Sequence, residues 1–192
     1  MAKKIFVSGF SGIGKSYFTK TVSEKFNLSL IKEVIREEEV RCQATYLEKY
    51  IEIHTNKKLN NFICDRTVID VLIWNRYDIK NINSDSMIKP DLVIIPPNPD
   101  MDYIMENIEY WLIDPVRLVS YNTKYNIELQ NIPKNRICEL LFADFVLEKN
   151  LLELYYQQFD WSYYSIRDFN PRNYLNWQVK AIDYLENFIK NI

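Results

Sequence analysis

The stretch Gly9-Phe-Ser-Gly-Ile-Gly-Lys-Ser16 decides the fold, and it directly follows the apolar run Ile5-Phe-Val7. It matches the phosphate-binding loop pattern, which is a glycine, four residues of any type and then Gly-Lys-Ser or Gly-Lys-Thr. A backbone that wraps around a polyphosphate must point several N–H groups inward, and glycine permits the necessary dihedrals and close approach. The sequence therefore predicts a strand, a nucleotide-binding loop and a helix, in that order.

The side chains at the end of the loop have distinct expected roles. Lys15 brings a positive charge to the outer phosphates, and Ser16 offers a hydroxyl to Mg²⁺. Both lie at the start of the predicted helix, where the helix dipole favours an anion. The residues expected to bind the nucleotide here are Gly9, Ser11, Gly12, Ile13, Gly14, Lys15, Ser16 and Tyr17.

The distribution of glycine supports this interpretation. The chain contains three glycines, and all of them lie in the loop, at Gly9, Gly12 and Gly14. The alternative is a glycine-rich turn between a strand and a helix with no ligand. The Lys-Ser pair that ends the motif makes that alternative much the weaker of the two.

Length and composition limit the class of protein. A chain of 192 residues with 47% hydrophobic residues predicts one globular domain, residues 1–192. The net charge of −2 argues against binding long nucleic acid through many phosphate contacts. The N-terminus runs directly into the first strand, and no apolar run reaches transmembrane length, so we expect no membrane association.

Cysteine usage points to a reducing compartment. The three cysteines are far apart and form no C-x-x-C pair, so they indicate neither a disulfide framework nor a zinc site. We therefore expect a cytoplasmic protein, acting as a monomer or a homodimer.

Apolar runs predict five strands, at residues 4–8, 28–31, 61–65, 91–95 and 163–166. Helical patterns run from the loop to residue 26 and over 34–57, 67–77, 101–113, 135–158 and from 171 to the end. Strands that alternate with helices predict an α/β fold, a parallel sheet covered by helices on both faces.

Several local signals refine these boundaries. Asn27 is expected to end the first helix, and Pro171 to open the last one. Thr67 with Asp70 three residues later predicts a capping box at a helix start.

Ligands of such sheets bind at the carboxyl ends of the strands. Asp65 ends an apolar strand, and there its carboxylate can provide the second protein contact to Mg²⁺. Arg66 stands where many hydrolytic ATPases have a glutamate that activates water, so it favours contact with a phosphate or substrate oxygen. Its alternative role is a surface salt bridge. The guanine-reading motif of GTPases is absent, since Asn122-Thr-Lys-Tyr125 does not match it.

These motifs together resemble the P-loop nucleoside and nucleotide kinase superfamily. The matching residues are Gly9–Ser16, Glu33-Val-Ile-Arg36 after the second strand, and Cys64-Asp-Arg-Thr67 with Asp70 after the third. The similarity is greatest to its ribosylnicotinamide kinase-like and deoxynucleoside kinase-like members. It implies ATP and Mg²⁺ as cofactors, and a five-stranded sheet in the order 2-3-1-4-5.

The resemblance also implies further site residues. Glu33 stands where such kinases place the acid that contacts the acceptor hydroxyl, and Arg36 would help to hold the acceptor. The alternative for Glu33 is a helix N-terminal carboxylate favoured by the dipole. The fold normally carries a lid after its fourth strand, which corresponds to about residues 114–136. The lid cations considered are Arg117, Lys124, Lys134 and Arg136, with Arg117 and Arg136 preferred.

The loop after the fifth strand corresponds to the segment that grips adenine in related kinases. Phe169 or Arg172 could stack on the base there, although the same segment can be a plain turn. His54, the single histidine, falls on the apolar face of its predicted helix together with Ile51. We therefore expect a packed histidine and not a catalytic one.

Three functions remain open at this point. The first is an ATP- and Mg²⁺-dependent phosphotransferase that acts on a nucleoside, a nucleotide or a related small acceptor. The second is a kinase of a nucleic-acid 5′ end or modified base, which the charge does not favour. The third is an ATP-binding regulatory protein without catalysis.

Overall fold

A computed structural model describes residues 3–10, 12–32, 43–74, 87–109 and 132–190, with only the backbone given for 43–46 and Trp74. Its strands are β1 (Lys4–Val7), β2 (Ser29–Ile31), β3 (Phe62–Asp65), β4 (Leu92–Ile95) and β5 (Tyr163–Ser165). Its longer helices are α1 (Lys15–Phe26), α2 (Gln43–Thr55), α3 (Val68–Trp74), α4 (Met101–Glu106), α8 (Lys134–Gln158) and α9 (Asn176–Lys190). A short 3₁₀ turn, η4 (Pro171–Asn173), precedes α9.

The strands form one parallel sheet in the order β2-β3-β1-β4-β5, which confirms the predicted topology. The central strand β1 pairs with β3 on one side and β4 on the other. Val7, at its carboxyl end, lies beside Asp65 in β3 and Ile94 in β4. The loop that leaves β1 therefore starts at the middle of the carboxyl edge.

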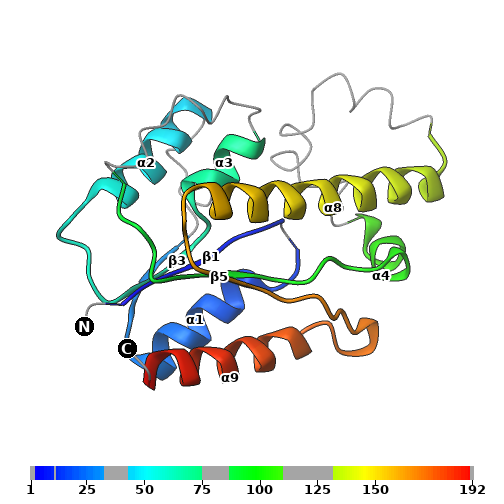
Figure 1. Cartoon of the computed structure of the whole chain (residues 1–192). Helices are drawn as coiled ribbons and strands as arrows, with labels where there is room; N and C mark the ends of the chain where they lie inside the picture. Colours follow the sequence, from blue (N-terminus) through cyan, green and yellow to red (C-terminus); the bar gives the residue numbers. More distant parts are fainter. Residues whose placement is uncertain (1–2, 11, 33–42, 75–86, 110–131, 191–192) are drawn as a thin grey trace.

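Helices cover both faces of the sheet (Figure 1). Helices α1 and α9 lie side by side on one face, and α2, α3 and α8 lie on the other. Alternate residues of β1 point to opposite faces, since Ile5 and Val7 belong to the core under α1 and α9, whereas Phe6 belongs to the core under α2, α3 and α8.

Helix α1 forms as its sequence predicts. It begins after Gly14, and its buried stripe contains Phe18 and Val22, four residues apart. Asn27 adopts the left-handed conformation with φ 52°, and its N–H donates to the carbonyl of Ser23. Asparagine tolerates this conformation better than most residues, so it ends the helix as expected.

Two local predictions were wrong. The last helix does not begin at Pro171, because the side chain of Asn170 accepts from the Arg172 N–H and closes a separate 3₁₀ turn before α9. In α2, Tyr50 and His54 form the buried pair four residues apart, while Ile51 lies on the outer side and is 37% exposed. One helical position rotates the side chain by about 100°, enough to turn Ile51 out of the core.

Candidate functional site

The loop that joins β1 to α1 has the backbone that its glycines permit. Gly9, Gly12 and Gly14 have φ angles of 110°, 91° and 82°, all in the region that side chains disfavour. At Gly14 space is limiting as well, since an added Cβ would lie 2.9 Å from Gln178 Nε2 and from Leu175 Cδ2. Ser11 lies outside the described residues.

The structure brings the two predicted metal ligands together. The Ser16 hydroxyl, in the first turn of α1, donates to Asp65 Oδ2 at 2.7 Å. Asp65 is 1% exposed at the end of β3, and its backbone carbonyl accepts from the Tyr50 hydroxyl at 2.8 Å. Lys15 is also buried, and its amine donates to the carbonyl of Phe10 within the loop.

Asp70 fixes the start of this loop from the α3 side. Its Oδ1 accepts from the Gly9 N–H at 2.7 Å, and its Oδ2 accepts from Ser8 Oγ at 2.8 Å. Oδ2 also accepts from the backbone N–H and the hydroxyl of Thr67. The predicted capping box is therefore present. No local pattern in the sequence indicates that the capping carboxylate also binds the loop after β1.

Tyr156, on α8, completes this buried polar cluster. Its hydroxyl lies 2.5 Å from Ser8 Oγ and 2.9 Å from Thr67 Oγ1, and donates its single proton to one of them. Burial, followed by the negative charge of Asp70, raises the pKa of Tyr156 well above its usual value. The phenol therefore remains a hydrogen-bond donor at ordinary pH.

Arg66 is buried and not on the surface. It is 1% exposed, and its Nη1 donates to the carbonyl of Gly9 at 2.7 Å. The alternative of a surface salt bridge is therefore wrong. The guanidinium lies at the beginning of the loop, and Arg66 itself has an unusual positive φ of 83°.

Three successive loop carbonyls accept hydrogen bonds from side chains outside the loop. Trp177 Nε1 donates to Ile13 O at 3.0 Å and Gln178 Nε2 donates to Gly14 O at 3.1 Å. The Tyr103 hydroxyl, from α4, lies 3.5 Å from Gly12 O. Sequence reasoning missed these contacts, because no motif links α4 or α9 to the loop.

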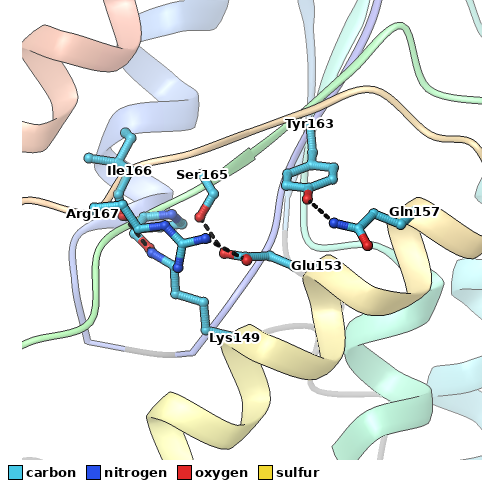
Figure 2. Close-up of polar contacts among 8 residues, drawn as sticks. Lys149, Glu153, Gln157, Tyr163, Ser165, Ile166 and Arg167 are labelled. Carbon is cyan, nitrogen blue, oxygen red and sulfur yellow. Dashed lines mark hydrogen bonds and ion pairs between the residues drawn. The ribbon is translucent and has the colours of Figure 1, made fainter.

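Lys149 joins the other half of the sheet edge (Figure 2). Its amine donates to Pro96 O at 2.8 Å and to Ile166 O at 2.5 Å, just beyond the ends of β4 and β5. Burial, helped by the positive charge of Arg167, lowers its pKa to about 8. Glu153, one turn further along α8, accepts from Ser165 and from Arg167, each at 2.6 Å.

The other predicted site residues lie apart from the buried cluster or outside the described residues. Arg136 is exposed in the first turn of α8 and pairs with Glu139. Arg172 is exposed in η4, and the Tyr17 side chain is 63% exposed on α1. Glu33, Arg36, Arg117 and Lys124 lie outside the described residues, as does most of the expected lid.

His54 is a packed side chain, as predicted. Its ring stacks on Phe6 and on Trp161, with centroid distances of 4.5 and 5.3 Å. Its Nε2 accepts from the Val68 N–H at 3.3 Å, and burial lowers its pKa to about 4. The ring is therefore neutral at pH 7.

The oxygen atoms of Ser16 and Asp65 suit a magnesium ion. Mg²⁺ prefers hard oxygen ligands, and in nucleotide enzymes it takes one or two from the protein and the others from phosphates and water. Within the described ranges, no group of three or more His, Cys, Asp or Glu side chains could hold a metal ion. None of the described helices is long and apolar enough to span a bilayer.

Comparisons with known proteins give matches among solved structures. No protein-family model matches the chain, and no curated protein matches it. Deoxyadenosine kinase from M. mycoides with bound dATP matches with a TM-score of 0.55 and 19% identity, over 96% of this chain and 99% of that one. The same enzyme with bound dCTP matches with a TM-score of 0.52 and 19% identity, over 96% and 98% of the two chains.

A solved structure from another organism supports the same fold. The YorR protein from Bacillus subtilis, in complex with phosphorylated GDP, matches with a TM-score of 0.51 and 13% identity, over 95% of this chain and 97% of that one. At such identities the similarity establishes the fold. The chain therefore has a P-loop kinase fold, with the strand order β2-β3-β1-β4-β5, and it shares this fold with the M. mycoides deoxyadenosine kinase.

Proposed function

We propose that this protein is an ATP- and Mg²⁺-dependent kinase that phosphorylates a nucleoside, a nucleotide or a related small acceptor. The observation that carries the proposal is the 2.7 Å contact between Ser16 and Asp65 beside a glycine loop that contains Lys15. A hydroxyl and a carboxylate brought together at the carboxyl edge of a parallel sheet suit a metal that is shared with a nucleotide.

Catalysis would consist mainly of positioning and charge stabilisation. The acceptor oxygen forms a bond to the γ-phosphorus while the bond to the β–γ bridging oxygen breaks, so negative charge spreads over the transferred group. Lys15 and the loop N–H groups would hold the phosphates, and Ser16 and Asp65 would hold Mg²⁺, which neutralises part of that charge when bound.

The remaining predicted residues have proposed roles toward the acceptor and the base. Glu33 or Asp65 would take the proton of the acceptor hydroxyl, and Arg66 would contact a phosphate or substrate oxygen. The lid cations proposed for the transferring phosphate are Arg117 and Arg136, and Arg172 would contact the base of ATP.

A nucleoside-like acceptor has support from the solved neighbours and from charge. The M. mycoides enzyme is a deoxyadenosine kinase solved with dATP or dCTP, and YorR was solved with phosphorylated GDP. The net charge of −2 is unfavourable for a long polyanionic acceptor. A small nucleoside or nucleotide is therefore the acceptor class that we propose.

Purified protein with labelled ATP and Mg²⁺ tests the proposal. The acceptor panel should contain nucleosides, nucleoside monophosphates, nicotinamide riboside and a 5′-hydroxyl oligonucleotide. We expect label on one of the small acceptors, and none when EDTA removes the metal. Label only on the oligonucleotide would replace the proposed acceptor class. ATP binding without any transfer would favour a regulatory protein.

A matched pair of lysine variants separates chemistry from folding. Lys15→Ala should lower turnover by about 100-fold or more, because it removes the charge proposed to hold the transferring phosphate. Lys20→Ala, on the same helix, should leave turnover unchanged, since Lys20 is an exposed side chain that pairs with Glu24 at 4.0 Å. Equal turnover in the two variants would contradict the role of Lys15.

A further inference from the structure

Helix α9 contacts the phosphate loop through two side chains of its first turn. Trp177 and Gln178 are 2% and 6% exposed, and their N–H groups reach Ile13 O and Gly14 O. We propose that these two are positioning residues for nucleotide binding, and that phosphate binding at the loop and docking of α9 stabilise each other. The inference rests on the proposed function, because it concerns the same phosphate site.

The direction of the peptide groups connects these contacts to phosphate binding. In a trans peptide, the carbonyl of one residue and the N–H of the next point in opposite directions, and the described chain has no cis bond. Trp177 lies outside the loop and binds the carbonyl of Ile13. The N–H of Gly14, on the other side of the same peptide, therefore points toward the inside of the loop. The Gly14 carbonyl already accepts from the Phe18 N–H at 3.0 Å, in the first turn of α1, and the Gln178 contact adds to this bond in orienting the Lys15 N–H. Such inward N–H groups bind phosphate in loops of this type.

Close packing also holds the start of α9 against the loop. The Cα of Gly14 lies so close to α9 that a Cβ there would meet Gln178 Nε2 and Leu175 Cδ2 at 2.9 Å. The Trp177 ring also packs on Phe18 of α1, with a centroid distance of 4.9 Å. Loop, α1 and the start of α9 therefore form one packed unit, in which a displacement of α9 would move the loop carbonyls.

The contacts with the loop carbonyls do more than fill the core. The packing of Trp177 on Phe18 does not require the indole N–H. Glutamine is also uncommon at a buried position, and Gln178 is 6% exposed. The N–H groups of Trp177 and Gln178 instead donate to two consecutive carbonyls of the loop. A buried donor favours the carbonyl orientation in which its hydrogen bond is made, since leaving the donor unpaired is unfavourable.

Mutual stabilisation follows from linkage. If a docked α9 gives the loop a higher affinity for phosphate, then bound phosphate must favour the docked α9 by the same factor. MgATP should therefore slow amide hydrogen exchange in α9, although this helix lies about 160 residues along the chain from the loop.

The test uses the full chain with two variants and one control. Trp177→Phe keeps the aromatic packing and removes the N–H, and Gln178→Leu keeps most of the volume and removes the amide. The control is Gln157→Leu, since Gln157 is exposed and donates at 2.8 Å to the Tyr163 hydroxyl, away from the loop. Dissociation constants for MgATP and for inorganic tripolyphosphate are measured by calorimetry, and hydrogen exchange is followed over residues 176–190.

We expect each α9 variant to weaken both ligands by about threefold to tenfold, which corresponds to one lost hydrogen bond. The control should bind like the wild type, and KM for ATP should rise more than kcat falls. Ligand should slow exchange in α9 of the wild type, and less so in the two variants.

The test separates a failure of this inference from a failure of the proposed function. A wild type that binds neither ligand would overturn both this inference and the proposed function. A wild type that binds and transfers phosphate, but whose α9 exchange is unchanged by ligand, would overturn the inference alone. The same holds if a folded Trp177→Phe variant binds as tightly as the wild type. Should Gln178→Leu fail to fold, Trp177→Phe and the wild-type exchange still decide the question.

Discussion

The two halves of the carboxyl edge are held by buried groups of opposite charge. In the β1–β3 half, Asp70 accepts four hydrogen bonds from described residues, one of them from the Gly9 N–H. In the β4–β5 half, Lys149 donates to the carbonyls of Pro96 and Ile166. One half is organised around an acceptor and the other around a donor.

This difference suits the anion that the β1–β3 half is proposed to bind. An acceptor beside the phosphate loop uses only the first N–H, that of Gly9, and leaves the later N–H groups of the loop for an anion. The Lys149 amine instead satisfies the carbonyls of Pro96 and Ile166, which lie just beyond the ends of β4 and β5 and so outside the strand pairing. Asp70 has more partners than Lys149, so we expect its half to lose more stability when its central group is removed.

Asp70→Ala should have the largest effect. It leaves two buried N–H groups, those of Gly9 and Thr67, without their acceptor, and should lower the free energy of unfolding by about 4 kcal/mol. Urea unfolding measures the loss. Asp91→Ala is the matched control, since Asp91 accepts one N–H, from Lys4 at 2.7 Å, at the opposite edge of the sheet. A loss no larger than that of the control would remove the contrast between the halves.

His54 makes the β1–β3 half sensitive to acid. Its pKa of about 4 in the folded protein lies below the ordinary 6.5, so the unfolded chain takes up the proton first as the pH falls. Stability is therefore lost between pH 6.5 and pH 4, by about 3 kcal/mol when the transition is complete. His54→Phe should lack this part of the pH dependence. Parallel stability curves for the two proteins would show that His54 does not titrate in this way.

Lys149→Met should have the smallest effect, about 1 kcal/mol at pH 9.5, because two carbonyls lose their donor while the cost of burying an amine disappears. The folded pKa of about 8 lies below the ordinary 10.5, so wild-type stability falls as the pH is lowered from 10.5 to 8. The difference between wild type and variant should therefore be smaller at pH 7.5 than at pH 9.5. A difference that grows toward pH 7.5 would contradict the lowered pKa.

The sequence predicted what depends on residues close together along the chain. The glycine loop, the strand that ends at Asp65, the capping box at Thr67 and the cap at Asn27 are all local patterns, and the structure contains each of them. The alternation of strands and helices predicted the parallel sheet, and the family resemblance predicted its order.

The contacts that hold the loop could not be predicted in this way. Asp70 reaches Gly9 across 61 positions, and Trp177 reaches Ile13 across 164. Helical periodicity can place such residues on an inner face, but it does not identify the backbone group that they will meet. Lys149 is a further example, because a lysine in a helical pattern is usually interpreted as exposed.

The position of Trp177 has a practical consequence. Its indole N–H binds a carbonyl of the loop, so the electronic environment of the ring changes whenever that carbonyl moves. The protein thus carries a fluorophore at the edge of its own phosphate loop. The chain has four tryptophans, so the share of the emission that Trp177→Phe removes is the part that can follow loop motion in real time, without an attached dye.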